Sequence, residues 1–288
     1  MKRHFFLILA STLLVLAVNA QNYSIHFQPK KNDAYDVRTT LKSTITQQVM
    51  GEEMTVNMGM DMNSVYSFDD DGANKTLHIT YDKMKVDMNM LGMATTINSE
   101  DDTKQSAILK QLKGKTVSLS ITPQGDIVKV TGAENLLDGI DADPSQIETI
   151  KGIVGSDAVK SSMAMSMGFY PGKPVKVGQT WTKTITLTHP YELVSESAYT
   201  LKRVEGKKAF IEVLSKLHTP ADAKMEYGGM TMSVHLEGDV TGTYEVDLDT
   251  GLSVVSITKQ NMKGDIEAMG QKIPMTVTTE MNSTSVKH

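Results

Sequence analysis

Alternation of apolar and polar side chains from Met54 to Phe68 is the feature that most constrains the fold of this chain. Every even position in this stretch except Ser64 is apolar, and every odd position except Val65 is small or polar. Side chains alternate across the pleat of a β-strand, so the pattern predicts a strand with one buried and one solvated face. Fifteen residues at about 3.3 Å each extend roughly 50 Å, which requires a large, bent sheet.

Similar alternation elsewhere predicts about ten or eleven strands. A change of parity before Met84 predicts a β-bulge in the strand that follows Asp69–Lys75. Helical periodicity is confined mainly to residues 98–112 and 134–169. We therefore predict an α+β fold with one large, curved, mostly antiparallel sheet, an incomplete β-barrel, whose concave face is covered by helices.

The first twenty residues are typical of a secretory signal peptide. Two basic residues precede an apolar run from Phe5 to Val18, and Val18-Asn19-Ala20 fits a small-residue cleavage site. We expect export to the periplasm or the extracellular space, and a single β-rich domain over residues 21–288. No later stretch approaches 18 consecutive apolar residues, so no transmembrane helix is predicted.

Composition excludes several classes of function. The chain has no cysteine, which rules out disulfides and cysteine metal sites. Its net charge of −5 carries no basic block, which argues against nucleic-acid binding and against attraction to anionic lipid. The oligomeric state is left open.

The two ends of the chain resemble each other. Residues 84–92 share Met, Lys, Asp and Gly in register with residues 262–270, and Gly51 begins a segment echoed at Gly228. These matches predict repeated meanders at about 35–100 and 192–286, separated by a helical insert at about 134–168. The alternative is convergence on similar turn chemistry. A repeat would place five apolar residues at the rims of the curved sheet: Met50, Leu91, Met93, Met230 and Met269.

The segment Tyr170–Trp181, the Asp247–Gly251 turn and the order of signal peptide, long strands and central helices resemble a family of secreted proteins from Bacteroidetes-type Gram-negative bacteria. The resemblance covers most of the chain after residue 20, rests on structural turns and implies no activity or site residues. The element order is also similar to that of periplasmic lipoprotein carriers, which are half-barrels lidded by helices. That likeness concerns the fold alone.

No enzymatic signature is found. A nucleophile needs a base beside it, but the histidines at 26, 78, 189, 218, 235 and 288 are far apart in sequence and lie in no recognisable motif. Phosphate loops, dinucleotide fingerprints and paired histidines are also missing from the sequence. We expect a non-enzymatic protein without cofactor or metal.

Twenty methionines against one tryptophan are the unusual compositional feature. Methionine is flexible and suits irregular apolar binding surfaces. Three interpretations remain: a concave surface that holds an apolar ligand, thioether binding of Cu(I) by Met58, Met60 and Met62, or a filled core. The candidate ligand-binding residues are Met54, Met58, Met60, Met62, Tyr66, Met84, Met88, Met90, Met163 and Met167.

The sequence therefore predicts an exported protein that binds an apolar or lipid-like molecule on a methionine-rich sheet face. The alternative is a structural or protein-interaction module of the cell envelope without a small ligand.

Overall fold

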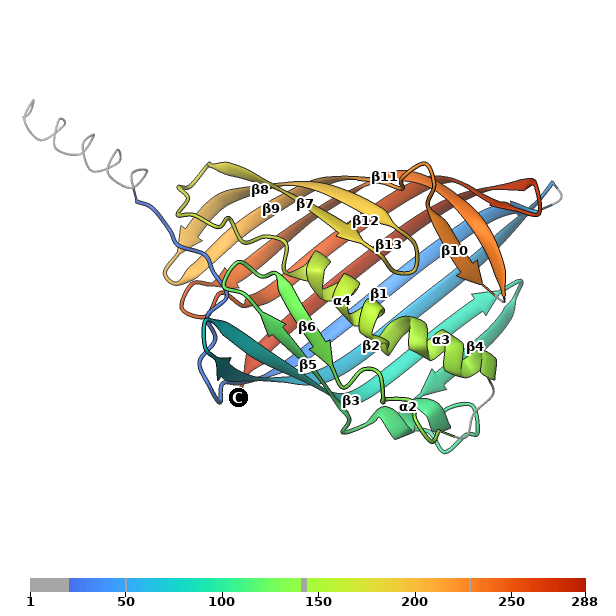
Figure 1. Ribbon diagram of the computed structural model, residues 1–288, viewed down its shortest axis with the longest axis horizontal. Coiled ribbons are helices and arrows are strands. Elements are labelled where there is room, and N and C mark those ends of the chain that lie inside the picture. Colours follow the sequence, from blue (N-terminus) through green and yellow to red (C-terminus); the bar gives the residue numbers. More distant parts are fainter. Residues whose placement is uncertain (1–20, 50, 141–143, 228) are drawn as a thin grey trace, which may run out of the picture.

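A computed structural model describes residues 21–49, 51–140, 144–227 and 229–288. The predicted signal peptide and Met50 lie outside these residues. Thirteen strands of the described chain form one antiparallel sheet (Figure 1). They are β1 (Ala34–Val49), β2 (Glu52–Asp71), β3 (Asn74–Met90), β4 (Met93–Asn98), β5 (Thr116–Ile121), β6 (Ile127–Thr131), β7 (Thr180–Leu187), β8 (Leu193–Glu205), β9 (Lys208–His218), β10 (Lys224–Tyr227), β11 (Met230–Asp247), β12 (Ser253–Ala268) and β13 (Gln271–Lys287).

The sheet is open, with β6 and β7 as its edges. Its order is β6-β5-β3-β2-β1-β13-β12-β11-β9-β8-β7, with β4 added to β3 and β10 added to β11. The predicted curved, mostly antiparallel sheet is confirmed. The predicted strand number is low, because β4 (Met-Ala-Thr-Thr-Ile-Asn) does not alternate between apolar and polar residues and β10 has only four residues.

The predicted β-bulge lies at Asp82. Asn63 pairs with Lys83 and Ser64 pairs with Tyr81, so Asp82 is left without a partner on β2. The extra residue explains why buried residues occupy odd positions up to Tyr81 and even positions from Met84 onward. Both halves of β3 therefore keep their apolar side chains on the concave face.

An aromatic cluster fills one end of the curved sheet. Phe68 packs edge-on against Phe27 and Tyr35, with ring centroids 6.0 Å apart in both pairs. The segment before β1 crosses this end, where the Phe27 N–H donates to the Pro123 carbonyl at 2.8 Å. Tyr170 OH donates to the Gly251 carbonyl at 2.8 Å, which attaches the segment before β7 to the turn between β11 and β12. We call this the closed end.

Helices α3 (Pro144–Val154) and α4 (Ser156–Ser166) cross the concave face (Figure 1). Helix α4 contacts both edge strands, β6 and β7. Lys183 of β7 also donates to Asp126 Oδ1 in the β5–β6 turn at 2.9 Å. The helix and this ion pair therefore join the two edges of a sheet that does not close by strand pairing.

Two predicted helical segments are shorter than expected. Helix α2 covers only Ala107–Leu112, and the residues before it form turns in which the Asn98 side chain accepts from the Glu100 N–H. Such local bonds compete with a helix. Residues 134–139 are also turns, and Gly139 has φ +73°, a left-handed conformation that interrupts a helix.

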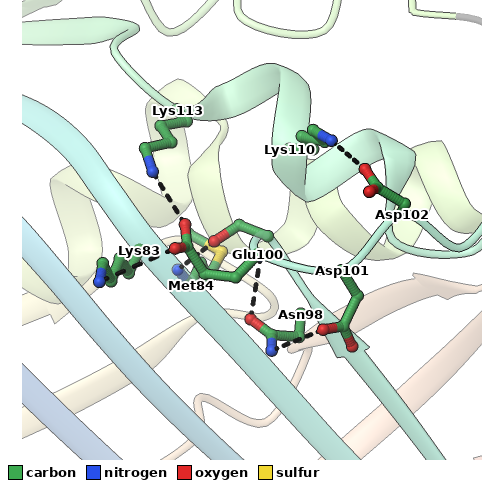
Figure 2. Close-up of polar contacts among 9 residues, drawn as sticks. Lys83, Met84, Asn98, Glu100, Asp101, Asp102, Lys110 and Lys113 are labelled. Carbon is green, nitrogen blue, oxygen red and sulfur yellow. Dashed lines mark hydrogen bonds and ion pairs between the residues drawn. The ribbon is translucent and has the colours of Figure 1, made fainter.

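Polar contacts fix the loop before α2 against β3. Figure 2 shows Glu100 between Lys83 of β3 and Lys113, which follows α2. The Lys113 Nζ donates to Glu100 Oε1 at 2.8 Å, and this bond lowers the pKa of Glu100 from its usual value. In α2 itself, Ile108, Leu109 and Leu112 are buried. Helix α2 thus seals the β3 edge between β4 and β5.

Four hairpins turn at the end of the sheet opposite the aromatic cluster. They join β1 to β2, β3 to β4, β10 to β11 and β12 to β13 (Figure 1, right). The register confirms this placement, because Gln47 pairs with Met54 on one side and with Met275 on the other. We call these turns the hairpin tips. The predicted repeat itself stays a prediction. In the described part of the chain, no helix has the length and apolar character needed to span a membrane.

Candidate functional site

A cavity of about 500 Å³ lies between the sheet and the helices. Its floor is formed by β3, β2, β1, β13 and β12, and its roof by the α3–α4 junction, α4 and the loop after β7. The cavity exists because the sheet is much larger than its cover. The two helices of eleven residues each reach roughly 33 Å together, whereas β2 alone, with twenty residues, extends roughly 65 Å.

Methionine side chains form one wall of the cavity. Met58, Met60 and Met62 project from β2 into it. The strand register pairs Met58 with Met88 and Met62 with Met84 of β3. The methionines are therefore arranged as cross-strand pairs as well as along one strand, and their flexible side chains can adapt to ligands of varied shape.

Hydroxyl groups line the neighbouring part of the floor. Thr39 of β1 and Ser283 of β13 lie 3.2 Å apart through their hydroxyl oxygens and both line the cavity. Just beyond them, Ser43 and Thr279 make a similar contact at 3.0 Å. We define the hydroxyl stripe as the hydroxyl-bearing cavity-lining residues of β1, β12 and β13: Thr39, Ser253, Ser256, Ser283 and Ser285. The amide of Gln260 on β12 also lines the cavity.

The roof combines methionines and serines of α4, the following residue Met167 and the loop after β7. Met163, Met165 and Met167 all line the cavity, together with Ser161 and Ser162. In the loop, His189 Nε2 lies 3.1 Å from the Gly152 carbonyl and donates to it in the tautomer that carries the proton there. This contact attaches the β7–β8 loop to α3 and fixes one side of the roof.

The cavity is lined almost entirely by uncharged side chains. Its described lining residues include no Asp, Glu, Lys or Arg, and His189 is the titratable nitrogen base among them. Burial raises the pKa of Tyr66 to about 12 and that of Tyr81 further. Both phenols therefore stay protonated. A buried charge would find no Asp, Glu, Lys or Arg partner here and would be costly, so the cavity suits apolar groups and neutral hydrogen-bonding groups.

The predicted site residues fall into three groups. Cavity-lining residues are Met58, Met60, Met62, Tyr66, Met163 and Met167. Met84 is a core residue with 2% exposure, whereas Met54, Met88 and Met90 lie nearer the hairpin tips, the last two being 37% and 39% exposed. Binding by any of them stays a prediction. The hydroxyl stripe and Met165 were not foreseen, although the alternation of Met281, Ser283 and Ser285 marks them as sharing one strand face.

One polar arrangement on the opposite, convex face was also missed. His78 Nδ1 lies 2.8 Å from Ser118 Oγ, and His78 Nε2 lies 3.3 Å from Asp69 Oδ2. These residue types match a catalytic triad, but Ser118 stands in mid-strand between His78 and Thr131, where backbone N–H groups serve the ladder. Acyl-transfer catalysis also needs oxyanion donors around the nucleophile, and we assign no role to this cluster. The described residues hold no group of three or more His, Cys, Asp or Glu side chains fit to bind a metal ion.

The fold and cavity define a class of protein: an open, curved, mostly antiparallel sheet whose edges are joined by a helix over an interior lined mainly by uncharged side chains. Within that class, the chain belongs to the family of unknown function DUF6263, whose model matches residues 72–253. The sequence predicts membership of a family without assigned function, and this match confirms that prediction. The search of curated proteins finds no significant match.

Solved structures resemble the chain in fold. A structure of lipovitellin, titled for its lipid–protein interactions, aligns with 89% of this chain at 9% identity and a TM-score of 0.52. The chain spans a quarter of the length of that protein, as the alignment covers 25% of it. The β domain of the Bordetella autotransporter BrkA and OccK7 of Pseudomonas aeruginosa align with 89% of the chain and with 100% and 99% of their own lengths, at 7% and 6% identity. Their TM-scores of 0.26 and 0.24 make them too distant to bear on fold or function.

Proposed function

We propose that this chain is an exported, non-enzymatic protein that binds a lipid-like molecule in the cavity between sheet and helices. The observation that carries the proposal is a largely uncharged cavity of about 500 Å³ with a methionine wall. Small-ligand sites have volumes of about 300–1,000 Å³, are mostly apolar and carry a few polar groups that orient the ligand. Export is supported by the N-terminal sequence pattern.

The two sides of the cavity specify the class of ligand. The cavity-lining methionines of β2, Met58, Met60 and Met62, favour a hydrocarbon chain, and the hydroxyl stripe favours a hydrogen-bonding group. A carboxylate or phosphate held inside the cavity would find no Lys or Arg among the described lining residues. We therefore infer an amphipathic molecule whose buried polar group is an alcohol, ester or amide. The likeness to lipovitellin adds no weight, because at 9% identity it concerns the fold alone.

Native mass spectrometry combined with organic extraction of the purified protein tests the proposal. We expect a co-purifying apolar molecule, and we expect delipidated protein to bind a fluorescent monoacylglycerol more tightly than the corresponding free fatty acid. Met60→Trp should fill the cavity from the methionine wall and weaken binding by about tenfold or more, because added volume displaces the ligand. Asn57→Trp places the same bulk on the opposite face of β2 and should bind normally.

Ser283→Trp provides a second filling variant from the floor, in case Met60→Trp disturbs folding. Circular dichroism and urea unfolding establish that each variant is folded before binding is compared. Normal binding by two folded filling variants would exclude the cavity as the site. If, in addition, no apolar molecule is extracted from the wild-type protein, the alternative of a structural or protein-interaction module would be favoured.

A further inference from the structure

The exposed apolar residues of the described chain are concentrated at the hairpin tips. Ten large hydrophobic side chains are exposed, and six of them lie at or next to the tips: Met88, Met90, Leu91, Met93, Met230 and Met269. The other four, Val128, Leu214, Ile257 and Val286, are scattered. Single exposed hydrophobic residues are normal on a protein surface, but several at one end of a molecule indicate contact with an apolar phase or a partner.

Two tips place apolar residues where the backbone disfavours them. Leu91 has φ +53° before Gly92 at +80°, and Met269 has φ +51° before Gly270 at +76°. Two successive positive φ values define a hairpin turn in which Asn, Asp or Gly is preferred at the first position. Leucine and methionine are unfavourable there, and their side chains are 65% and 87% exposed. Neither residue therefore gains burial in the folded protein that would offset its backbone strain.

The apolar surface continues from the tips to the cavity. On β2, Met58 lines the cavity, and Val56 and Met54 follow on the same face toward the tip, both half-buried. Val56 pairs with Met90 and Met58 pairs with Met88 on the neighbouring strand. The opposite, aromatic end of the sheet is closed. The cavity and the tips thus share one continuous inner face, which becomes more exposed toward the tips.

Charges near the tips favour a neutral surface. Within three residues of the four tips the sequence has Glu52, Glu53, Glu226, Glu267 and Lys272. Four acidic side chains against one basic side chain do not favour an anionic membrane, which attracts clusters of Lys and Arg. The apolar residues also stand on separate hairpins, which a fluid lipid layer can surround individually.

We propose that the hairpin tips insert into the surface of a net-neutral lipid layer, with Leu91, Met93, Met230 and Met269 as the inserting side chains. This contact goes beyond the proposed ligand binding and stands whether or not the cavity holds a lipid. In combination, the two would place the exposed end of the inner face against the lipid from which a ligand could be taken.

Flotation of purified protein with phosphatidylcholine vesicles tests the contact. We expect wild-type protein to float with the vesicles and the double variant Leu91→Asn, Met269→Asn to lose at least about tenfold in partitioning, the order expected when one buried apolar side chain is lost. Asparagine is favoured at both turn positions, so this variant should unfold at the same or higher urea concentration. Leu214→Asn, Ile257→Asn removes two exposed apolar side chains of the outer sheet face and should float like wild type.

Wild type and all variants are produced in the same way, so that differences in flotation cannot come from different N-termini. Three results would overturn the inference: no flotation of wild type, equal flotation of the tip variant, or binding to phosphatidylglycerol vesicles alone that salt reverses. A wild-type dimer that the tip variant abolishes, without vesicle binding, would show instead that the tips join two copies. Extraction of co-purified lipid from the tip variant separates the two proposals. If the cavity binds no lipid, none co-purifies, but flotation of the wild-type protein is unaffected.

Discussion

At the residue scale, the closed end depends on a close approach of two backbones at Gly251. A Cβ atom at this position would lie 1.9 Å from the His26 carbonyl oxygen, and Gly251 has φ +72°. Its own carbonyl accepts from the buried Tyr170 hydroxyl. The absence of a side chain lets the segment before β1 cross the end of the sheet and bury Phe27.

Gly251→Ala should therefore be strongly destabilising. We expect a loss of roughly 2–5 kcal/mol in the free energy of unfolding, about 1–2 from the left-handed backbone and about 1–3 from the displaced His26 segment. Gly206→Ala is the matched control, because Gly206 has φ +59° with no atom within 4 Å of its Cβ position. Urea unfolding measures both, and equal losses would show that the approach to His26 is unimportant.

At the cavity, the sequence predicts which strand face a residue occupies but not whether that residue lines the cavity. Alternation assigns Met58, Met60 and Met62 to one strand face, because the pleat is strictly periodic. It cannot tell that the cavity reaches Met58 but not Met54, since both share that face. The position of the covering helix decides this, and it depends on contacts between residues far apart in sequence.

At the element scale, the bulge in β3 maintains the concave face. Asp82 is the extra residue: if β3 included it in regular pairing with β2, either the half ending at Tyr81 or the half beginning at Lys83 would turn its apolar side chains outward. A one-residue shift reverses every side chain of a strand.

Deletion of Asp82 should thus be tolerated far better than deletion of Thr80, which pairs with Val65 of β2. When Asp82 is deleted, Tyr81 and Lys83 keep their present partners Ser64 and Asn63, and we expect a loss of less than about 2 kcal/mol in the free energy of unfolding. Without Thr80, side chains of β3 next to the gap must change face, and we expect a loss of more than about 4 kcal/mol. Asp82→Ala keeps the bulge and should change stability by less than about 1 kcal/mol. Circular dichroism during urea titration compares the variants, and equal losses for the two deletions would show that the bulge does not set the direction of the β3 side chains.

The elements that sequence reasoning predicts well are those with long periodic patterns. The bulge was foreseen because Leu77, Ile79 and Tyr81 differ in parity from Met84 and Val86. The helix expected before Ala107 was wrong, because Asn98 and its neighbours satisfy the backbone through side-chain bonds. Helix α4 was placed correctly in sequence, but its contacts with both β6 and β7 depend on sheet curvature that no local pattern encodes.

At the scale of the whole molecule, the two ends of the sheet have different chemistry. Aromatic side chains from distant segments, among them Phe27, Phe68 and Tyr170, close one end, and methionines line the other. Sequence alone could not decide whether the interior is filled or hollow. That outcome depends on the mismatch between strands of up to twenty residues and two helices of eleven, which leaves the inner face partly uncovered.

The buried tyrosines predict how the whole fold responds to alkali. Burial raises the pKa of Tyr66 to about 12 and raises those of Tyr81, Tyr170 and Tyr244 further, whereas an unfolded tyrosine titrates near about 10. Above that pH the unfolded chain releases protons that the folded chain keeps, so stability falls as pH rises, by up to about 1.4 kcal/mol per pH unit for each group.

We expect the tyrosinate absorbance of these four residues to appear together with the loss of circular dichroism as the pH is raised beyond 10. In urea, where the chain is unfolded, the same absorbance should develop near the ordinary tyrosine pKa and therefore at lower pH. Tyr66→Phe removes one of the four groups and should make the stability less steeply dependent on pH while leaving neutral stability nearly unchanged, because the phenyl ring keeps the apolar contacts with the cavity wall. Full ionisation near pH 10 in a chain that keeps its circular dichroism would contradict burial of these phenols, and with it the closed, dry end that the aromatic residues are inferred to form.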